Sequence, residues 1–133
     1  MKLESFGTLL YRKINSKIEV LLVHPSGKPD QAWSIPKGNK NDGEKGIEAA
    51  ARETLEETGV SINIEDLHSF GYVVYKSKKV VHCYAAEVGP EIKPICNSWE
   101  VDKAEFVEIN KALTIIHKKQ AEFISKLIQQ LKV

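Results

Sequence analysis

The chain has few cysteines and no long apolar run, and both shortages limit what it can be. Cys83 and Cys96 alone in 133 residues are too few and too far apart for a disulfide framework, so we expect reduced thiols. No stretch approaches the roughly 20 apolar residues that cross a bilayer, and the first residues lack the sustained apolar segment of a signal peptide. These absences favour a cytoplasmic protein with no membrane partner.

An excess of charge of one sign is also missing. With 19 basic and 18 acidic residues, the formal net charge is +1. No strong electrostatic field is therefore expected to draw the chain to extended nucleic acid. The length and the 42% hydrophobic content suit one domain over residues 1–133, large enough for a single core. We expect the protein to be a monomer or a homodimer.

Strand and helix signals alternate along the chain. Apolar alternation and turn residues predict strands at 8–11, 18–23, 33–35, 70–75, 80–88 and 104–109. Helical spacing predicts one helix at 46–58 and another near the C-terminus, with Asn110 as a helix N-cap. No repeat or linker interrupts these elements, so we predict the α+β class, as one αβα sandwich.

The helix at 46–58 carries an unusual acidic side. Its helical periodicity predicts one buried face, made of Ile47, Ala50, Ala51, Thr54, Leu55 and Thr58. Glu53, Glu56 and Glu57 fall together on the opposite side. Like charges three or four residues apart destabilise a helix by roughly 0.2–0.5 kcal/mol per pair, and a hard divalent cation is the simplest compensation. The alternative is an ordinary solvated face.

The spacing of glycines, glutamates and an arginine around this helix is more specific than its charge. Residues 38–60 read GNKNDGEKGIEAAARETLEETGV, which resembles the Nudix box, Gly-x5-Glu-x7-Arg-Glu-aliphatic-x-Glu-Glu-x-Gly-aliphatic. The resemblance implies a mixed sheet between helices. It also implies a Nudix hydrolase, which uses Mg²⁺ or Mn²⁺ to cleave a pyrophosphate linkage in a nucleoside diphosphate derivative. Thr54 departs from the aliphatic position, which we interpret as a packing variation on the buried face.

The same resemblance implies roles for individual residues. The metal ligands would be the backbone carbonyl of Gly38 with Glu53, Glu56 and Glu57. We expect Arg52 to orient a glutamate of the catalytic set rather than to bind substrate. Glu44 is expected to have a structural role, either at the N-terminal dipole of the helix or in tying the preceding loop to the helix.

The general base is left open among Glu53, Glu56, Glu100 and Glu105. Residues 99–106 are similar to a Nudix segment that brings a distal glutamate to the metal. Glu100 is preferred to Glu105 because it lies at a loop-to-strand junction, where a side chain can turn into a cleft.

Substrate contacts are the least determined part of the site. Lys37 could meet a phosphate, and Tyr84 or His82 could contact a base, as could Tyr75; packing within the hairpin is the alternative for these rings. Residues 33–38 are similar to Nudix enzymes that act on diadenosine polyphosphates and diphosphoinositol polyphosphates. We therefore expect a small nucleotide substrate, a dinucleoside polyphosphate or a nucleoside triphosphate. The alternatives are an RNA 5′-end pyrophosphohydrolase and a non-catalytic nucleotide-binding module. Specificity is expected in the loops at 24–30 and 91–99.

Overall fold

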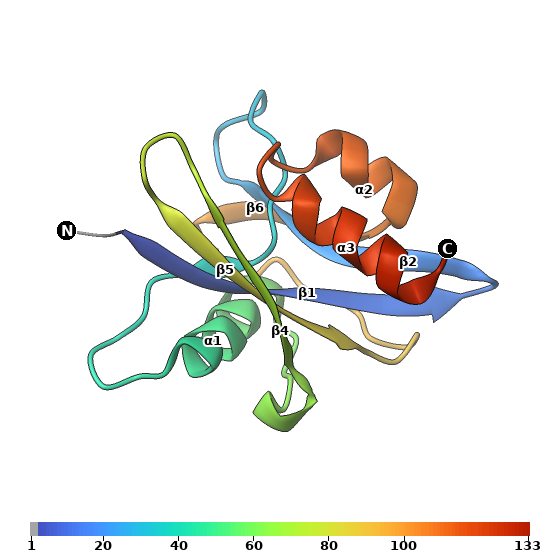
Figure 1. Cartoon of the computed structure of the whole chain (residues 1–133), viewed down its shortest axis with the longest axis horizontal. Coiled ribbons are helices and arrows are strands. Elements are labelled where there is room, and N and C mark those ends of the chain that lie inside the picture. The colour runs from blue at the N-terminus through green and yellow to red at the C-terminus, as the bar shows by residue number, and fades with distance from the viewer. Residues whose placement is uncertain (1–2) are drawn as a thin grey trace.

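A mixed sheet lies between one helix on one face and two helices on the other in the computed structural model, which describes residues 3–133 (Figure 1). The strands are β1 (Glu4–Ile14), β2 (Lys17–Pro25), β3 (Lys37–Gly38), β4 (His68–Val74), β5 (Val80–Glu87) and β6 (Val101–Glu108). The helices are α1 (Gly46–Thr58), α2 (Ile109–Ile115) and α3 (Ala121–Leu131), with a short 3₁₀ turn, η1 (Ile64–Asp66). This arrangement is the predicted αβα sandwich of the α+β class.

Strand β1 is the centre of the sheet, whose order is β4-β5-β1-β2-β6. It pairs in parallel with β5, while its pairing with β2 and β3 is antiparallel, so the sheet is mixed. The predicted turn between the first two strands is a two-residue turn in which Asn15 and Ser16 both have positive φ. Such a turn matches the twist of the paired strands, which is why the long β1–β2 hairpin forms.

Strands β1 and β2 pair at their turn end and then separate. Their register runs from Ile14↔Lys17 to Tyr11↔Val20, whereas Phe6 and Gly7 of β1 pair instead with Gly38 and Lys37 of β3. The segment leading to β3 therefore fills the space between the diverging strands. This wedge carries residues 37 and 38 to the middle of the sheet, beside helix α1.

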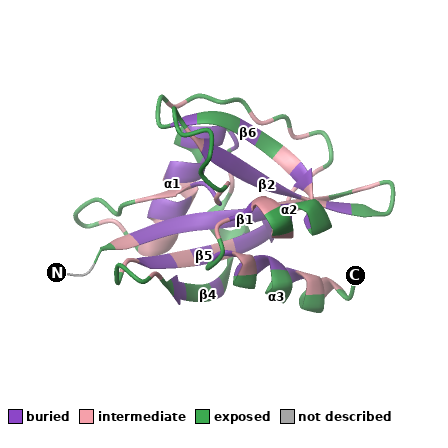
Figure 2. Ribbon diagram, turned by 90° about the horizontal axis from the view of Figure 1, so that it is seen from above, coloured by how far each residue is buried: buried purple, intermediate pink, exposed green. Residues whose placement is uncertain are grey.

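The core is divided by the sheet into two unequal parts. The larger part lies under α2 and α3, where Leu9, Leu22 and Leu127 are fully buried. The smaller part lies under α1 and includes Leu10 and Leu21. Neighbouring residues of one strand thus enter opposite layers, as the alternation of a strand requires. Figure 2 shows the buried positions concentrated in the central strands and on the sheet-facing side of α1.

The structure corrects the predicted rotation of α1. Leu55, assigned to the buried face, is 47% exposed, whereas Glu53 and Glu57, assigned to the opposite side, are 9% and 5% exposed. The helix turns these two glutamates toward β3, where the glycine at position 38 leaves room for the Glu53 carboxylate. Gly59 ends the helix in the left-handed conformation, at φ 72°, as a glycine cap commonly does.

Two further expectations differ in detail. The N-cap of α2 is Glu108 rather than Asn110, because the Glu108 carboxylate accepts from the backbone N–H groups of Asn110 and Lys111. Residues 33–35 form isolated bridges, Val23↔Ser34 and Trp33↔Ile116, instead of a strand. Within residues 3–133, none of the helices has the length and apolar character needed to span a membrane.

Candidate active site

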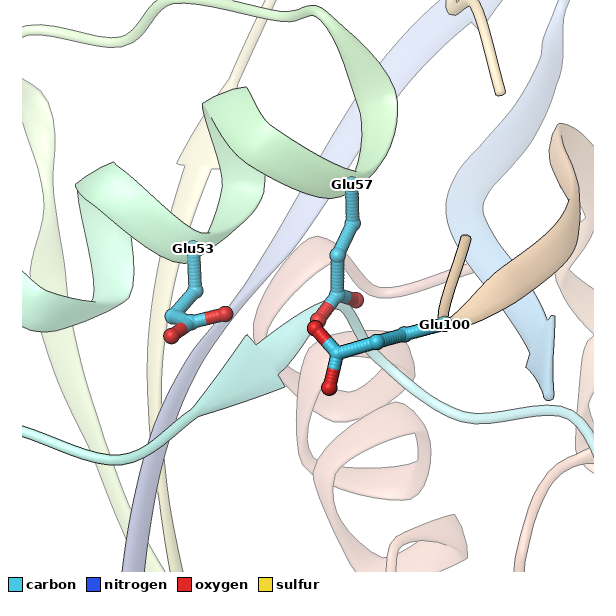
Figure 3. Close-up of side chains that lie close together, drawn as sticks. All are labelled: Glu53, Glu57 and Glu100. Atoms are coloured by element: carbon cyan, nitrogen blue, oxygen red, sulfur yellow. The ribbon is translucent and has the colours of Figure 1, made fainter. Parts of the chain in front are cut away.

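Three carboxylates from two distant parts of the chain meet at one end of α1. Glu53 and Glu57 lie one helical turn apart, and Glu100 reaches them from the residue before β6 (Figure 3). One oxygen from each of the three lies within 4.8 Å of the others. Glu100 is exposed while the other two are buried. The predicted helix pair and the predicted distal glutamate are therefore brought together.

Strand β3 forms the floor of this cluster. Gly38 lies so close to Glu53 that a Cβ atom there would overlap the Glu53 carboxylate. The backbone N–H of Lys37 donates to the carboxylate of Glu57. Both buried glutamates therefore lie against the main chain of β3, Glu53 beside Gly38 and Glu57 beside Lys37.

Burial and mutual repulsion make these carboxylates hard to ionise. Burial, with the charge of Glu53 nearby, raises the pKa of Glu57 to about 8, although Lys37 acts in the opposite direction. The pKa of Glu53 is raised by its own burial and by Glu56. The side chains present therefore do not neutralise the cluster. Several carboxylate oxygens and a nearby main chain are the donor set of a hard divalent cation, and the residues fit such an ion.

Arg52 connects the cluster to the loop before α1. Its guanidinium donates to Glu44 through Nε at 2.9 Å and Nη2 at 3.1 Å, and to Glu53 and Glu56 through Nη1 at 3.1 and 3.0 Å. Nη2 also donates to the backbone carbonyl of Asn39 at 2.8 Å. Glu44 in turn accepts from the Asn41 N–H at 2.9 Å, so it ties the loop to the helix, one of its two expected roles.

Glu56 takes a different position from its two neighbours. It is exposed, its carboxylate pairs with Arg52, and it is not among the three carboxylates that converge. It is near enough to Glu53 to raise the pKa of that group. Its predicted role as ligand or base stays a prediction. Glu105 is exposed on β6 beside Arg12 and Phe106, in a groove that contains none of the three clustered glutamates.

A pocket of about 280 Å³ opens beside the cluster. Glu57, Glu100 and Lys37 contribute to its wall, and Trp33, Tyr75, His117 and Gln120 are among the other lining residues. The rings of Tyr75 and His117 stack in parallel with centroids 4.2 Å apart. Gln120 donates to the Tyr75 hydroxyl at 2.8 Å and accepts from the Ile35 N–H at 2.9 Å. The pocket thus combines carboxylates, an aromatic wall and a basic group.

Lys37, in the wall of this pocket, has Lys79 next to it. The pKa of Lys37 is lowered to about 8, first by burial and then by the charge of Lys79, whose side chain it contacts. Burial and these same two lysines also lower the pKa of His117. Three nitrogen groups from three elements therefore gather where an anionic ligand would relieve their repulsion.

Sequence reasoning placed some of these groups and missed others. Lys37 and Tyr75 were considered, whereas His117, Gln120 and Lys79 were not. They lie on the helical C-terminal region and the hairpin turn, and no local motif marks them. A signal was available only for Trp33, which precedes the Pro-Lys-Gly segment.

The two other predicted substrate contacts lie away from this pocket's lining. His82 stacks on Phe6 at 4.6 Å and its Nε2 lies 2.7 Å from a Glu4 oxygen. Tyr84 packs with Phe6 against α1. Both rings therefore take part in packing on the α1 side of the sheet, and a substrate role for them stays a prediction.

Comparison with known proteins points to one family. The sequence profile of the NUDIX domain matches residues 2–130. The asymmetrical bis(5′-nucleosyl)-tetraphosphatase of Caenorhabditis elegans is 41% identical over 61 residues, which span 46% of this chain and 44% of that protein. The corresponding enzyme of Mus musculus is 35% identical over 99 residues, 66% of this chain and 67% of its own length.

Solved structures agree with the sequence relatives. A crystal structure described as a C. elegans Ap4A hydrolase binary complex superposes with a TM-score of 0.82 at 28% identity, covering 96% of this chain and 98% of the other. The NUDIX domain of Shewanella oneidensis NrtR, complexed with ADP ribose, gives a TM-score of 0.83 at 18% identity over 98% and 89% of the two chains. The second likeness shows the shared fold alone.

Proposed function

The chain belongs to the NUDIX domain family, and from that premise we propose that it is a Mg²⁺-dependent hydrolase of a phosphoanhydride bond in a dinucleoside polyphosphate. The observation that carries the proposal is the meeting of Glu53, Glu57 and Glu100 at the mouth of an aromatic pocket with a lysine in its wall. The prediction that the chain is a Nudix hydrolase is confirmed at the level of the family. The identity of the substrate is the part that we propose.

The chain's own oxygens are arranged to hold the metal. Glu53 and Glu57 are the main ligands, and the backbone carbonyl of Gly38 and Glu56 complete the set. The nearby charge of Glu100 adds to the attraction for the cation. Mg²⁺ suits such a site because it needs only a few carboxylates and keeps several waters, and Mn²⁺ could replace it. When bound, the metal lowers the pKa of a water and offsets phosphate charge.

Glu100 is the proposed general base. It is the exposed member of the three carboxylates, and it lines the pocket from which a substrate would approach. A carboxylate oxygen so placed can take the proton from the water that attacks phosphorus. The buried Glu53 and Glu57 are the better ligands because their surroundings already hold them in place.

Arg52 acts on the glutamates rather than on the substrate. All three of its guanidinium nitrogens are engaged with Glu44, Glu53, Glu56 and a backbone carbonyl. A planar group held by several acceptors fixes the direction of each carboxylate. Its contribution is therefore the orientation of Glu53 and Glu56.

The phosphate chain and a nucleobase of the substrate have different partners at the pocket. Lys37 in the pocket wall, with Lys79 next to it, offers positive charge to the phosphate chain. Trp33, Tyr75 and His117 offer ring faces on which a nucleobase can stack. The relatives that are tetraphosphatases support a dinucleoside polyphosphate as the substrate.

A substrate panel tests this proposal. Purified protein with Mg²⁺ is given diadenosine tetraphosphate, ATP, ADP-ribose and 5′-triphosphorylated RNA, and products are separated by chromatography. We expect water to be added across one anhydride of diadenosine tetraphosphate, which yields ATP and AMP, and we expect Glu57→Gln to abolish that product. Preferential release of pyrophosphate from the RNA would replace this substrate with an RNA 5′ end. Tight binding without turnover of any compound, with Mg²⁺ or Mn²⁺, would leave a nucleotide-binding module.

A further inference from the structure

His24 and Asp102 form a hydrogen-bonded pair that is not part of the cluster of Glu53, Glu57 and Glu100. His24, at the end of β2, is buried, and its Nδ1 lies 3.0 Å from an Asp102 oxygen on β6. Its Nε2 donates to the backbone carbonyl of Gln31 at 3.0 Å, because a carbonyl can only accept. One imidazole therefore bridges two segments that approach the site separately.

The pair spans a break in the register of the sheet. His24 pairs with Lys103, but the next residue, Pro25, pairs with Val101, so Asp102 is the extra residue of a bulge. Bulges bend a strand and re-aim the side chains beside them, and they are common next to active sites. Glu100 lies two residues before Asp102, and Figure 3 shows its side chain reaching Glu57 from the beginning of the strand.

Glu100 needs such support because its position is electrostatically unfavourable. One of its carboxylate oxygens lies within 4.8 Å of oxygens of Glu53 and Glu57, so repulsion between like charges would tend to move it outward into water. The backbone nearby is held: the Ser26 N–H donates to the Glu100 carbonyl at 2.9 Å, and the Glu100 N–H donates to the Ser98 hydroxyl at 3.1 Å. Asp102 and His24 secure the other side of the same turn.

The second segment held by His24 is the pocket wall. Gln31 precedes Trp33, whose ring lies 5.5 Å from the His24 ring and which lines the pocket. The loop at 26–32 has few other attachments among the described residues, namely a turn from Lys28 to Gln31 and the Ser26 bond to Glu100. The His24 bond to Gln31 thus fixes the loop that delivers Trp33.

We propose that His24 and Asp102 are positioning residues that lock the β6 bulge, aim Glu100 at Glu53 and Glu57, and hold the Trp33 wall of the pocket. This inference rests on the proposed function, since it assigns a supporting pair to that same site. Asp102 itself contacts neither the metal ligands nor the pocket. The pair acts through the backbone on either side of it.

The first test measures metal binding without turnover. Mn²⁺ affinity is determined by electron paramagnetic resonance for the wild type, Asp102→Ala, Asp102→Asn and Glu19→Ala. We expect Asp102→Ala to weaken Mn²⁺ binding by roughly tenfold, as loss of a partner behind a ligand commonly does. Asp102→Asn keeps an acceptor oxygen and should stay within about threefold of wild type on the same reasoning. Equal losses in both Asp102 variants, or no loss in either, would overturn the proposal.

Glu19→Ala is the matched control. It removes the 2.8 Å ion pair with Arg12 at the opposite end of β2, so it breaks a cross-strand contact of the same strand away from the cluster. We expect it to change thermal stability without changing Mn²⁺ affinity. A loss of affinity in this control equal to that of Asp102→Ala would make the effect a general loss of stability.

A second variant tests whether the two residues act together. His24→Phe removes both hydrogen bonds and keeps a ring against Trp33. If His24 and Asp102 act as one unit, the double variant His24→Phe with Asp102→Ala weakens Mn²⁺ binding no more than either single change. Additive losses would mean that they act independently.

Amide hydrogen exchange separates this inference from the proposed function. The Ser26 N–H reports the anchor to Glu100 whether or not metal binds. We expect its exchange to accelerate at least tenfold in Asp102→Ala relative to Glu19→Ala. If wild-type protein bound no Mn²⁺, the proposed function would fail. The exchange rate of the Ser26 N–H would still test the positioning role of His24 and Asp102. Unchanged Ser26 exchange would refute the positioning role.

Discussion

Gly38 in β3 lies directly beneath the carboxylate of Glu53 in α1. A Cβ atom at position 38 would overlap the carboxyl carbon and both oxygens. The glycine is therefore required by space rather than by backbone conformation, since its φ is not among the positive values. One missing methyl group is what lets a buried glutamate rest on the main chain of the sheet.

Gly38→Ala should displace the Glu53 carboxylate and weaken divalent cation binding by roughly tenfold or more, since the position of a ligand is lost while the fold is kept. The side chain of Glu53 ends in a flexible group, so thermal stability should fall only slightly. Calorimetric titration with Mn²⁺ measures the effect, with the exposed Lys40→Ala as control. Mn²⁺ affinity in Gly38→Ala equal to that of wild type would contradict this account.

The metal-free protein should lose stability as pH rises from about 5 to about 8. Glu57 has a pKa of about 8 in the folded protein against an ordinary value of 4.5, so the folded state holds its proton more tightly than the unfolded state does. Ionising Glu57 in the folded state therefore lowers the free energy of unfolding, by an amount on the order of a few kcal/mol at pH 8. Melting temperatures in EDTA at a series of pH values measure this loss.

Glu57→Gln removes this titrating group, so its melting temperature should fall less than that of wild type over the same pH range and should exceed it at pH 8. Glu105→Gln, on an exposed position of β6, should follow the wild-type curve. Mg²⁺ should raise the wild-type melting temperature more at pH 8 than at pH 6. Parallel pH profiles for wild type and Glu57→Gln would show that Glu57 ionises normally.

Arg52→Ala should lower kcat for diadenosine tetraphosphate by roughly 10–100-fold with little change in KM, the pattern expected when an orienting partner of a ligand is removed. Arg52→Lys should not restore kcat, because one ammonium cannot reach Glu44, Glu53 and Glu56 together. Steady-state kinetics at saturating Mg²⁺ provide the comparison. A rise in KM alone would instead place Arg52 on the substrate.

The hydroxyls of Thr8 and Thr54 form a buried pair between β1 and α1, 2.7 Å apart. Thr54→Val should reduce the free energy of unfolding by about 1–2 kcal/mol, because it leaves the Thr8 hydroxyl buried with one partner fewer. The double change Thr8→Val with Thr54→Val should cost less than the sum of the single changes. Urea denaturation of the four proteins measures this coupling, and simple additivity would argue against a pairwise bond.

The order and type of most elements could be read from the sequence because they are local. The exceptions are β3, the bridges at 33–34 in place of a strand, and the division of the predicted C-terminal helix into α2 and α3. Turn residues marked the β1–β2 and β4–β5 hairpins, and Gly59 marked the end of α1. The face of α1 that meets the sheet could not be read in the same way. Helical periodicity assigns charged residues to water, and Glu53 and Glu57 are exceptions because Glu53 lies against the glycine of β3 and Glu57 against the backbone of Lys37.

The site divides along the same line between local and distant contacts. The spacing from Gly38 to Gly59 pointed to the glutamates of one helix, and the loop-to-strand junction pointed to Glu100. The aromatic wall was only partly foreseeable, because Tyr75 and His117 meet across the sheet and the C-terminal region. Such pairs depend on how layers pack, for which a single sequence holds no periodic signal. The burial of Thr54, in contrast, was predicted and is confirmed.

The central position of β1 has a consequence for how the protein is made. This strand is synthesised early, yet its parallel partner is β5, with Glu4 paired to Val80 and Tyr11 to Glu87. Until the ribosome has released β5, one edge of β1 has its backbone groups unpaired and its apolar side chains uncovered. The β1–β2 hairpin therefore lacks a partner on this edge until β5 has been synthesised. Stalling of translation between β2 and β5 would leave an unpaired strand edge that can pair with other nascent chains.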